Sequence, residues 1–271
     1  EKWAEFIEYN RQDVVVEKVI RKRLLSLKPP AIEREYWLLD QDINWRGVKV
    51  DMDLVDAALQ CNDEIVEKAT VSSARLTGLD NPNSTLQLKE WLTERLGYEI
   101  ETMRKDDVSD LLSQDIPSDV RTVLKNRQVL GNSSIKKYLA MKNAVCSDGR
   151  IHGMLQFYGA MRSGRWAGRV VQLQNLPRNY LEDLDTARDV LKSRDVELLD
   201  LLYGNPGDVI KQLIRTALVA EDGHRFIVAD FSAIEARVIA WLAHEQWRQD
   251  VFAQGGDIYC ASASSMFHVP V

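Results

Sequence analysis

The stretch FIVADFSAIEARVIAWL, residues 226–242, decides how the rest of the chain is interpreted. Its first four residues are apolar and have the length and branching of a buried strand, which would deliver Asp230 at its end. After the aspartate the apolar spacing becomes helical, with Ile234, Val238 and Leu242 on one face. The pattern predicts a strand, a tight turn and a helix, with the Asp230 carboxylate held rigidly in the turn.

Two structural roles compete with a chemical role for the polar residues of this stretch. Ser232 and Glu235 fit a capping box, in which the serine accepts from the Glu235 backbone N–H and the Glu235 side chain reaches back. Asp230 also suits the positive end of the helix that follows it. Both roles stay open beside a functional one.

The longer stretch VADFSAIEARVIAWLA resembles motif A of the family-A DNA polymerases, the D-Y-S-Q-I-E-L-R strand and helix of the palm domain. Phe231 stands where Tyr is usual, while Asp230, Ser232, Glu235 and Arg237 are kept. The resemblance implies that the Asp230 side chain and the Phe231 backbone carbonyl bind Mg²⁺, a cation that prefers oxygen ligands. It also implies that Glu235 crowds the sugar 2′ position and selects deoxynucleotides, and that Arg237 contacts DNA.

The resemblance implies template-directed DNA synthesis, in which a nucleotide is transferred from a dNTP to a primer 3′ hydroxyl during DNA replication. Such transfer uses two metal ions held by at least two carboxylates. The chain supplies one of them, Asp230, and the second palm carboxylate and the fingers are expected beyond Val271, in a longer parent or another chain. We therefore predict a polymerase portion that does not extend primers alone, with two Mg²⁺ in the complete enzyme.

Two other function classes stay open. The chain could be a non-catalytic fragment that binds primer–template DNA. It could also be a metal nuclease built on Asp230, a reading disfavoured because no other acids cluster around that residue in the sequence.

The charge distribution favours a nucleic-acid partner in spite of the formal net charge of −6. Residues 121–178 hold eleven Lys or Arg against one acid, Asp148, so this basic tract carries +10 and the remainder of the chain −16. An acidic body with one basic tract holds a polyanion in one place and repels it elsewhere. A solvated basic face is the structural alternative.

Composition sets further bounds. The 271 residues, 45% hydrophobic, are enough for about two domains. No stretch approaches the roughly 20 apolar residues of a membrane helix, and no signal peptide is recognisable, which indicates a cytoplasmic protein of a bacterial or phage-infected cell without a membrane partner. The three cysteines are far apart and are expected to be reduced and mostly buried: Cys61, Cys146 and Cys260.

A second resemblance to the family lies within the basic tract. The stretch RIHGMLQFYGAMRSGRWAGRVVQLQNLPR, residues 150–178, follows the family order R-I-H, T-G-R-L-S-S and L-Q-N-x-P, with Trp166-Ala167-Gly168 in place of L-S-S. The resemblance implies that Arg165 reaches the minor groove at the primer end, where Gln174 and Asn175 also contact the duplex. Minor-groove acceptors are nearly alike for every base pair, which suits an enzyme that holds any sequence. For Gln174 and Asn175 a purely structural hydrogen-bonding role stays open.

The thumb domain of the family is expected in the segment RTVLKNRQVLGNSSIKKYLAM, residues 121–141. Four of its residues are candidates for sequence-independent phosphate contacts: Ser133, Ser134, Lys136 and Lys137. Residues 179–208 form an acidic helical insert without an assigned chemical role, which Asn205-Pro206-Gly207 is expected to end.

The N-terminal segment resembles the end of the family's 3′ to 5′ exonuclease domain. Tyr9 and Asp13 match its Y-x-x-x-D motif and share one face of a predicted helix. The remaining carboxylates of an exonuclease would lie before residue 1, so this pair is expected to be a remnant.

The expected fold class is α+β, a helical thumb with part of an antiparallel-sheet palm. Three regions are predicted: residues 1–46 as exonuclease end and connector, 47–147 as thumb, and 148–271 as the first part of the palm with the start of the fingers.

Overall fold

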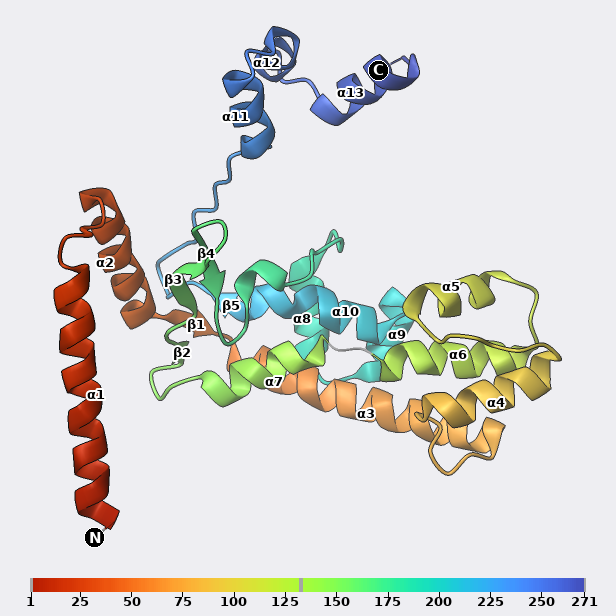
Figure 1. Cartoon of the computed structure of the whole chain (residues 1–271). Helices are drawn as coiled ribbons and strands as arrows, with labels where there is room; N and C mark the ends of the chain where they lie inside the picture. Colours follow the sequence, from red (N-terminus) through yellow and green to blue (C-terminus); the bar gives the residue numbers. More distant parts are fainter. Residues whose placement is uncertain (1, 132–133, 271) are drawn as a thin grey trace. The chain divides into compact units, whose positions relative to one another are not determined.

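Helices predominate in the chain, and its strands are short and antiparallel, which confirms the expected α+β class (Figure 1). The structure, a computed structural model, describes residues 2–131 and 134–270. It divides into two units, residues 1–221 and 222–271, and each is described by itself. The three regions expected from the sequence stay a prediction.

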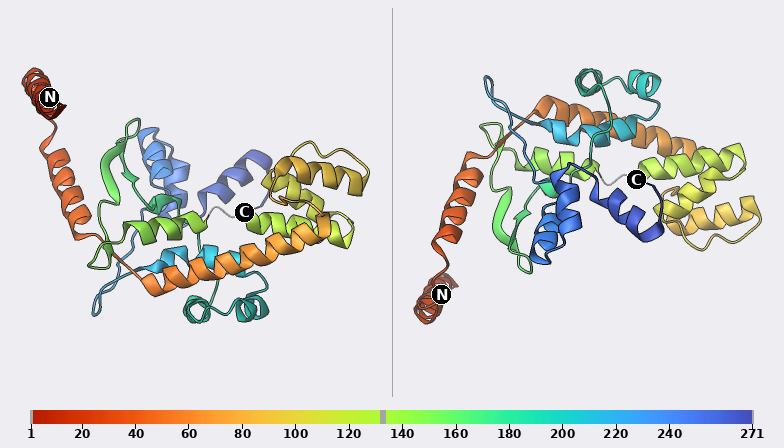
Figure 2. Two further views of the ribbon diagram at one scale, coloured as in Figure 1. Left: turned by 90° about the horizontal axis from the view of Figure 1, so that it is seen from below. Right: turned by 90° about the horizontal axis from the view of Figure 1, so that it is seen from above.

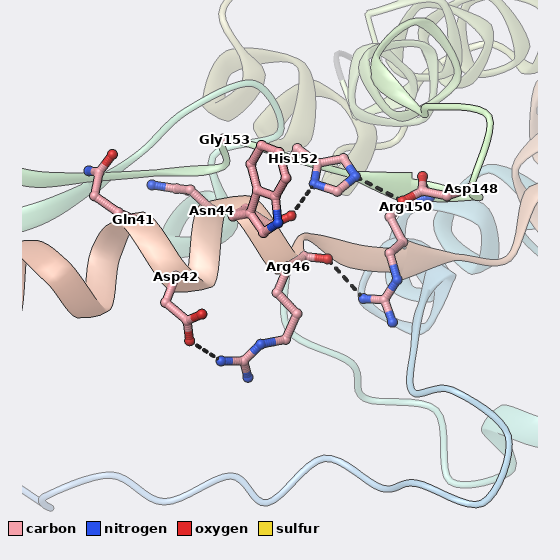
Figure 3. A pocket seen from close by; sticks show the side chains of 9 residues that line it. Gln41, Asp42, Asn44, Arg46, Asp148, Arg150, His152 and Gly153 are labelled. Carbon is pink, nitrogen blue, oxygen red and sulfur yellow. Dashed lines mark hydrogen bonds and ion pairs between the residues drawn. The ribbon is translucent and has the colours of Figure 1, made fainter.

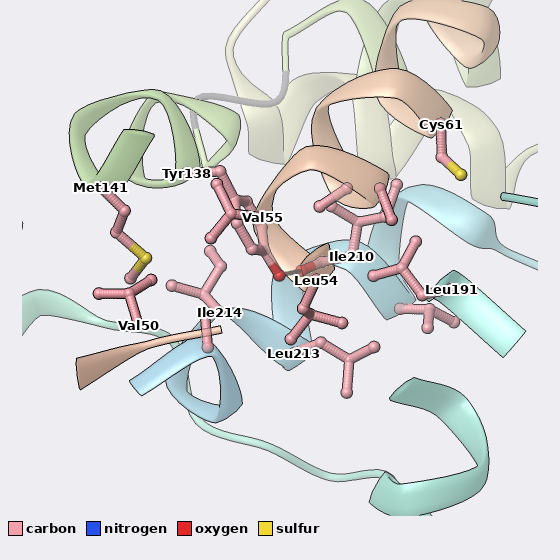
Figure 4. Close-up of a cluster of buried hydrophobic side chains, with 14 of the residues drawn as sticks. Val50, Leu54, Val55, Cys61, Tyr138, Met141, Leu191, Ile210, Leu213 and Ile214 are labelled. Atoms are coloured by element: carbon pink, nitrogen blue, oxygen red, sulfur yellow. Dashed lines mark hydrogen bonds between the residues drawn. The ribbon is translucent and has the colours of Figure 1, made fainter. Parts of the chain in front are cut away.

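The larger core of the first unit forms around helix α3 (Met52–Thr77). Asp51 caps this helix by accepting from the Leu54 backbone N–H at 3.1 Å. Helices α7 (Ile135–Ala144) and α10 (Pro206–Gln212) lie along α3, as the views of Figure 2 also show. Between them the Tyr138 hydroxyl donates to the Ile210 carbonyl at 2.8 Å within the apolar cluster of Figure 4.

A smaller core lies at the other end of α3. It is formed by α4 (Thr85–Leu96), α5 (Lys105–Ser113) and α6 (Ser118–Leu130). Ser84 caps α4 through the Gln87 backbone N–H, and Gly97 ends that helix in the left-handed region; serine and glycine are common residue types at these two positions.

The strand β1 (Val48–Val50) lies at the centre of a three-stranded antiparallel sheet between β2 (Arg150–Ile151) and β5 (Leu218–Val219). Gly47 precedes it with φ +65, and a Cβ there would lie 2.8 Å from the Ile151 carbonyl oxygen. Only glycine fits this position without strain. A separate hairpin consists of β3 (Leu155–Ala160) and β4 (Arg165–Gly168).

Two N-terminal helices precede the sheet, α1 (Lys2–Leu24) and α2 (Ala31–Arg46). Helix α1 buries none of its residues, while α2 contacts β3. The Asn44 side chain pairs with both backbone groups of Leu155, accepting from its N–H and donating to its carbonyl, each at 2.9 Å. The carboxamide thus acts as a strand partner at the start of the hairpin.

The acidic insert docks on α3 through α8 (Leu184–Lys192) and α9 (Val196–Tyr203). Its basic side chains face α3: Asp51 accepts from Arg188 at 2.6 Å and from Lys192 at 2.7 Å. The expected end of the insert is wrong in detail. Asn205 does not end a helix but caps α10, with Pro206 in its first turn, because Gly204 already closes α9.

The second unit holds α11 (Ile234–Leu242), α12 (Gln246–Ala253) and α13 (Ile258–Phe267). The buried strand predicted at residues 226–229 is wrong: these residues are extended without a strand partner, and Ile227 and Val228 are 85% and 90% exposed. A strand needs a neighbour for its backbone groups, and no described strand pairs with this one. Asp230 is therefore exposed on an extended segment and not held in a rigid turn.

The capping box of Ser232 and Glu235, one of the alternatives left open by the sequence, is not the N-cap that the structure has at this helix. Ala233, in the left-handed region at φ 50, is the N-cap of α11 and provides no side-chain cap. All three cysteines are free thiols, as expected, but the burial expected for them is wrong for two, since Cys146 and Cys260 are exposed and Cys61 is buried.

Candidate nucleic-acid interface

The β3–β4 hairpin presents Arg165 at the start of β4, with its side chain exposed. Phe157 and Trp166 pack edge to face across the two strands, with ring centroids 6.4 Å apart. Tyr158 has a φ of 52, and its ring fills the space beside Gly164, where a Cβ would lie 2.9 Å from the ring. Aromatic packing and this strained residue fix the turn that leads into Arg165.

Gln174 and Asn175 lie in the 3₁₀ turn η1 (Leu173–Asn175), which contacts β4. Both side chains are exposed. The Asn175 side-chain nitrogen donates to the Gln172 side-chain oxygen at 3.2 Å, and the Gln174 side chain lies against Gly168. The structure thus brings both residues to the strand that begins with Arg165, in the order that the sequence predicts.

Side chains from distant elements hold this segment in place. Lys137 donates from α7 to the Val171 carbonyl at 2.7 Å. Arg215 donates to the carbonyls of Pro177 and Leu176 at 2.7 and 2.8 Å. Backbone carbonyls between β4 and α8 are therefore satisfied by cations, which stabilises an otherwise irregular loop.

The basic tract divides between cations that bind other parts of the fold and cations that face solvent. Arg121 donates to the Leu112 and Gln114 carbonyls, Arg127 binds Asn83, and Lys142 pairs with Asp56. Lys137 belongs to this bound group, so the phosphate contact predicted for it competes with a structural bond. Sequence reasoning missed these bonds because each joins two different elements, and the partners of Arg127, Lys137 and Lys142 are 34 or more residues away.

The remaining thumb candidates have different positions. Lys136 is exposed on α7, and Ser134 is half-buried at the start of that helix. Ser133 lies outside the described residues. The phosphate contacts of all four candidates stay predictions.

A hollow between the end of α2 and β2 is lined by Arg150 and His152 of the R-I-H motif (Figure 3). His152 bonds the Trp45 carbonyl through Nδ1 at 2.7 Å and Asp148 through Nε2 at 3.0 Å. Arg150 donates to the Arg46 and Gly47 carbonyls and pairs with Glu221.

Charged and polar neighbours in this hollow shift the pKa values of His152 and Asp148. The Asp148 carboxylate, together with the Trp45 carbonyl, raises the pKa of His152. The Arg150 backbone N–H and His152 in turn lower the pKa of Asp148. Each ionised group therefore faces a neighbour of opposite charge or a backbone dipole. These contacts link the end of α2 to the three-stranded sheet.

The motif with Asp230 lies wholly in the second unit. Asp230 and Phe231 are exposed, the latter by 79%. Glu235 is in the first turn of α11. Within residues 2–131 and 134–270 no group of three His, Cys, Asp or Glu is close enough to hold a metal ion.

Arg237 is folded back on its own unit. Its Nε donates to the Ser232 carbonyl at 2.8 Å, and its guanidinium lies 4.4 Å from the Phe252 ring centroid. The arginine thereby links the turn beside Asp230 to α12. The DNA contact predicted for Arg237 stays a prediction.

Tyr9 and Asp13 are exposed on α1, as the helical spacing predicts, and their exonuclease role is untested. Among the helices described, none has the length and apolar character that crossing a membrane requires.

Comparison with known proteins places these features in context. Residues 54–271 match the family described as DNA polymerase family A. Over 271 residues the chain is 51% identical to the DNA polymerase of Bacillus phage SP02, and it spans 42% of that protein. An 85-residue stretch, 31% of the chain and 10% of the relative, is 39% identical to the thermostable DNA polymerase I of Thermus aquaticus.

Among solved structures with a similar fold is the POL domain of Pol1 from M. smegmatis in complex with DNA primer-template and dNTP. It superposes with a TM-score of 0.54 at 22% identity, over 83% of this chain and 36% of that one. The comparisons confirm the phage-type resemblance expected from the sequence.

Proposed function

The chain belongs to DNA polymerase family A, and from that premise we propose that it serves template-directed DNA synthesis as the portion that holds the primer–template. The observation that carries the proposal is the grouping of Arg165, Gln174 and Asn175 on β4 and the turn that packs against it. One cation and two carboxamides at one strand can bind minor-groove acceptors that all base pairs share. Lys136 and Ser134 add phosphate contacts from α7.

The DNA and nucleotide named in the M. smegmatis complex support the same partners here, a primer–template and a dNTP. Glu235, in the first turn of α11, would exclude ribonucleotides by occupying the space of a sugar 2′ hydroxyl. Its position at the start of a helix beside Asp230 is compatible with both residues facing one nucleotide.

Mg²⁺ is the cofactor expected for this chemistry. The Asp230 carboxylate and the Phe231 carbonyl offer the oxygen atoms that Mg²⁺ prefers. Among the described residues no group of three His, Cys, Asp or Glu could hold a metal ion, so they do not complete a two-metal site and no catalytic step is derived through one. Further ligands would have to come from polymerase residues other than these.

A non-catalytic role in DNA binding is the second candidate, favoured by the exposure of Asp230 and the absence of a metal cluster among the described residues. A metal nuclease is the third, and the isolation of Asp230 from other acids disfavours it.

One incubation tests whether the chain binds DNA, and it separates both DNA-binding candidates from a nuclease. The chain is mixed with 5′-labelled primer–template, dNTPs and Mg²⁺, and the primer length is read on a denaturing gel while a native gel reports binding. Binding without a change in length supports the proposal that the chain holds DNA and does not extend it alone. An extended primer would refute the prediction that the chain alone does not extend primers. A shortened primer would support the nuclease function, and no binding would reject the proposal.

A further inference from the structure

Gly168, the last residue of β4, leaves a space that a neighbouring side chain occupies. A Cβ at Gly168 would lie 2.0 Å from Oε1 of Gln174 and 3.0 Å from its Cδ. Real side chains never approach so closely, so the Gln174 carboxamide occupies space that only a glycine leaves open.

The backbone on both sides of this contact is fixed. Gln172 has a φ of 56, and its Cα would lie 3.0 Å from the same Cβ. The Lys137 bond to the Val171 carbonyl and the Asn175 bond to Gln172 restrain the turn on which Gln174 stands. The steric clash of a side chain at position 168 would therefore be relieved most easily by movement of the Gln174 carboxamide away from β4.

We propose that Gly168 is a positioning residue for duplex DNA: by lacking a side chain, it keeps the Gln174 carboxamide against the strand that begins with Arg165. The inference rests on the proposed function. A carboxamide held in this way loses less rotamer freedom on binding than one that moves in solvent, and it can donate to the minor-groove acceptors of any base pair.

The test is a thermodynamic cycle on the 271-residue chain, with a fluorescent primer–template as probe and anisotropy as the measurement. Gly168→Ala and Gln174→Ala are each expected to weaken binding about five- to tenfold, the effect of one hydrogen bond. The double variant is expected to bind no more weakly than Gln174→Ala alone, because Gly168 acts through Gln174. If Gly168 merely stabilised the hairpin, the affinity lost through Gly168→Ala would add to that lost through Gln174→Ala in the double variant.

Gly207→Ala is the matched control, since a Cβ there meets only Asn205 Oδ1 at 3.6 Å, and its affinity should equal that of the wild type. Wild-type affinity of Gly168→Ala, or additive losses in the double variant, would overturn the proposal. If Gly168→Ala melts early, Gln174→Asn replaces it: the shorter carboxamide should bind as weakly as Gln174→Ala, and wild-type binding would overturn the inference. A wild-type chain that does not bind primer–template rejects the proposed function itself.

Discussion

The ammonium of Lys137 lies 2.7 Å from the carbonyl oxygen of Val171 and ties α7 to the loop that carries Gln174 and Asn175. Lys136, the preceding residue, is exposed. Lys137 thus has a structural role within the fold, whereas the adjacent Lys136 lies at its surface.

Lys137→Met should lower the free energy of unfolding by about 1–2 kcal/mol, because it leaves the carbonyl of the buried Val171 without its charged donor. Thermal melting followed by circular dichroism measures the loss. Lys136→Met is the matched control and should melt as the wild type does. Equal melting of the two variants would show that the Lys137 bond contributes nothing to stability.

The insert should make stability sensitive to acid through Asp51. Burial opposes the ionised form, but the bonds from Lys192 and the Leu54 N–H and the charge of Arg188 outweigh it and lower the pKa of Asp51 below 3.8. The stability it contributes is fully present above pH 3.8 and is lost as the pH falls through the lower folded value. Melting temperatures measured at decreasing pH should therefore fall less steeply in Asp51→Asn, and parallel curves would contradict this.

The stability contributed by His152 should depend on pH in the opposite direction, falling as the pH rises. Its pKa is raised above 6.5 by Asp148, so the stability from this pair is fully present below pH 6.5 and is lost as the pH rises through the folded value. An NMR titration of the His152 ring checks the direction. Asp148→Asn should return the His152 midpoint toward 6.5, and an unchanged midpoint would remove Asp148 as the cause.

Arg237 should order the turn beside Asp230. Arg237→Gln removes a cation that stacks on Phe252, a contact worth about 0.5–1 kcal/mol at an exposed site. Backbone amides of residues 233–243 should then exchange faster with deuterium. Phe252→Leu should produce part of this effect and add little to Arg237→Gln, whereas unchanged exchange in both variants would contradict the positioning role.

The sequence predicted those features that depend on neighbours in the chain. The helical spacing that places Tyr9 and Asp13 on one face is such a feature, and so is the helix at Ile234, Val238 and Leu242. Caps and turns are equally local: Ser84 and Gly97 bound α4, and Gly47 adopts a positive φ, each with a residue type that suits its position.

The errors arise where distant residues decide the outcome. An apolar run at 226–229 satisfies the pattern of a strand, yet no described strand pairs with it, so Asp230 lacks the rigid support expected. The bond from Lys137 to the Val171 carbonyl was missed for the same reason, because its partner is 34 residues away in the sequence; the phosphate contact predicted for Lys137 stays untested. Charge counts do not distinguish cations that face DNA from cations that bind carbonyls.

The salt dependence of primer–template binding tests the central claim most directly. Anisotropy titrations of the chain from about 50 to 200 mM salt should give a linear fall of log affinity with log salt, the sign of released counterions. Lys136→Met should make this slope smaller by roughly one. Binding that does not change with salt, or no binding at all, would contradict the assignment of this chain as the part that holds DNA.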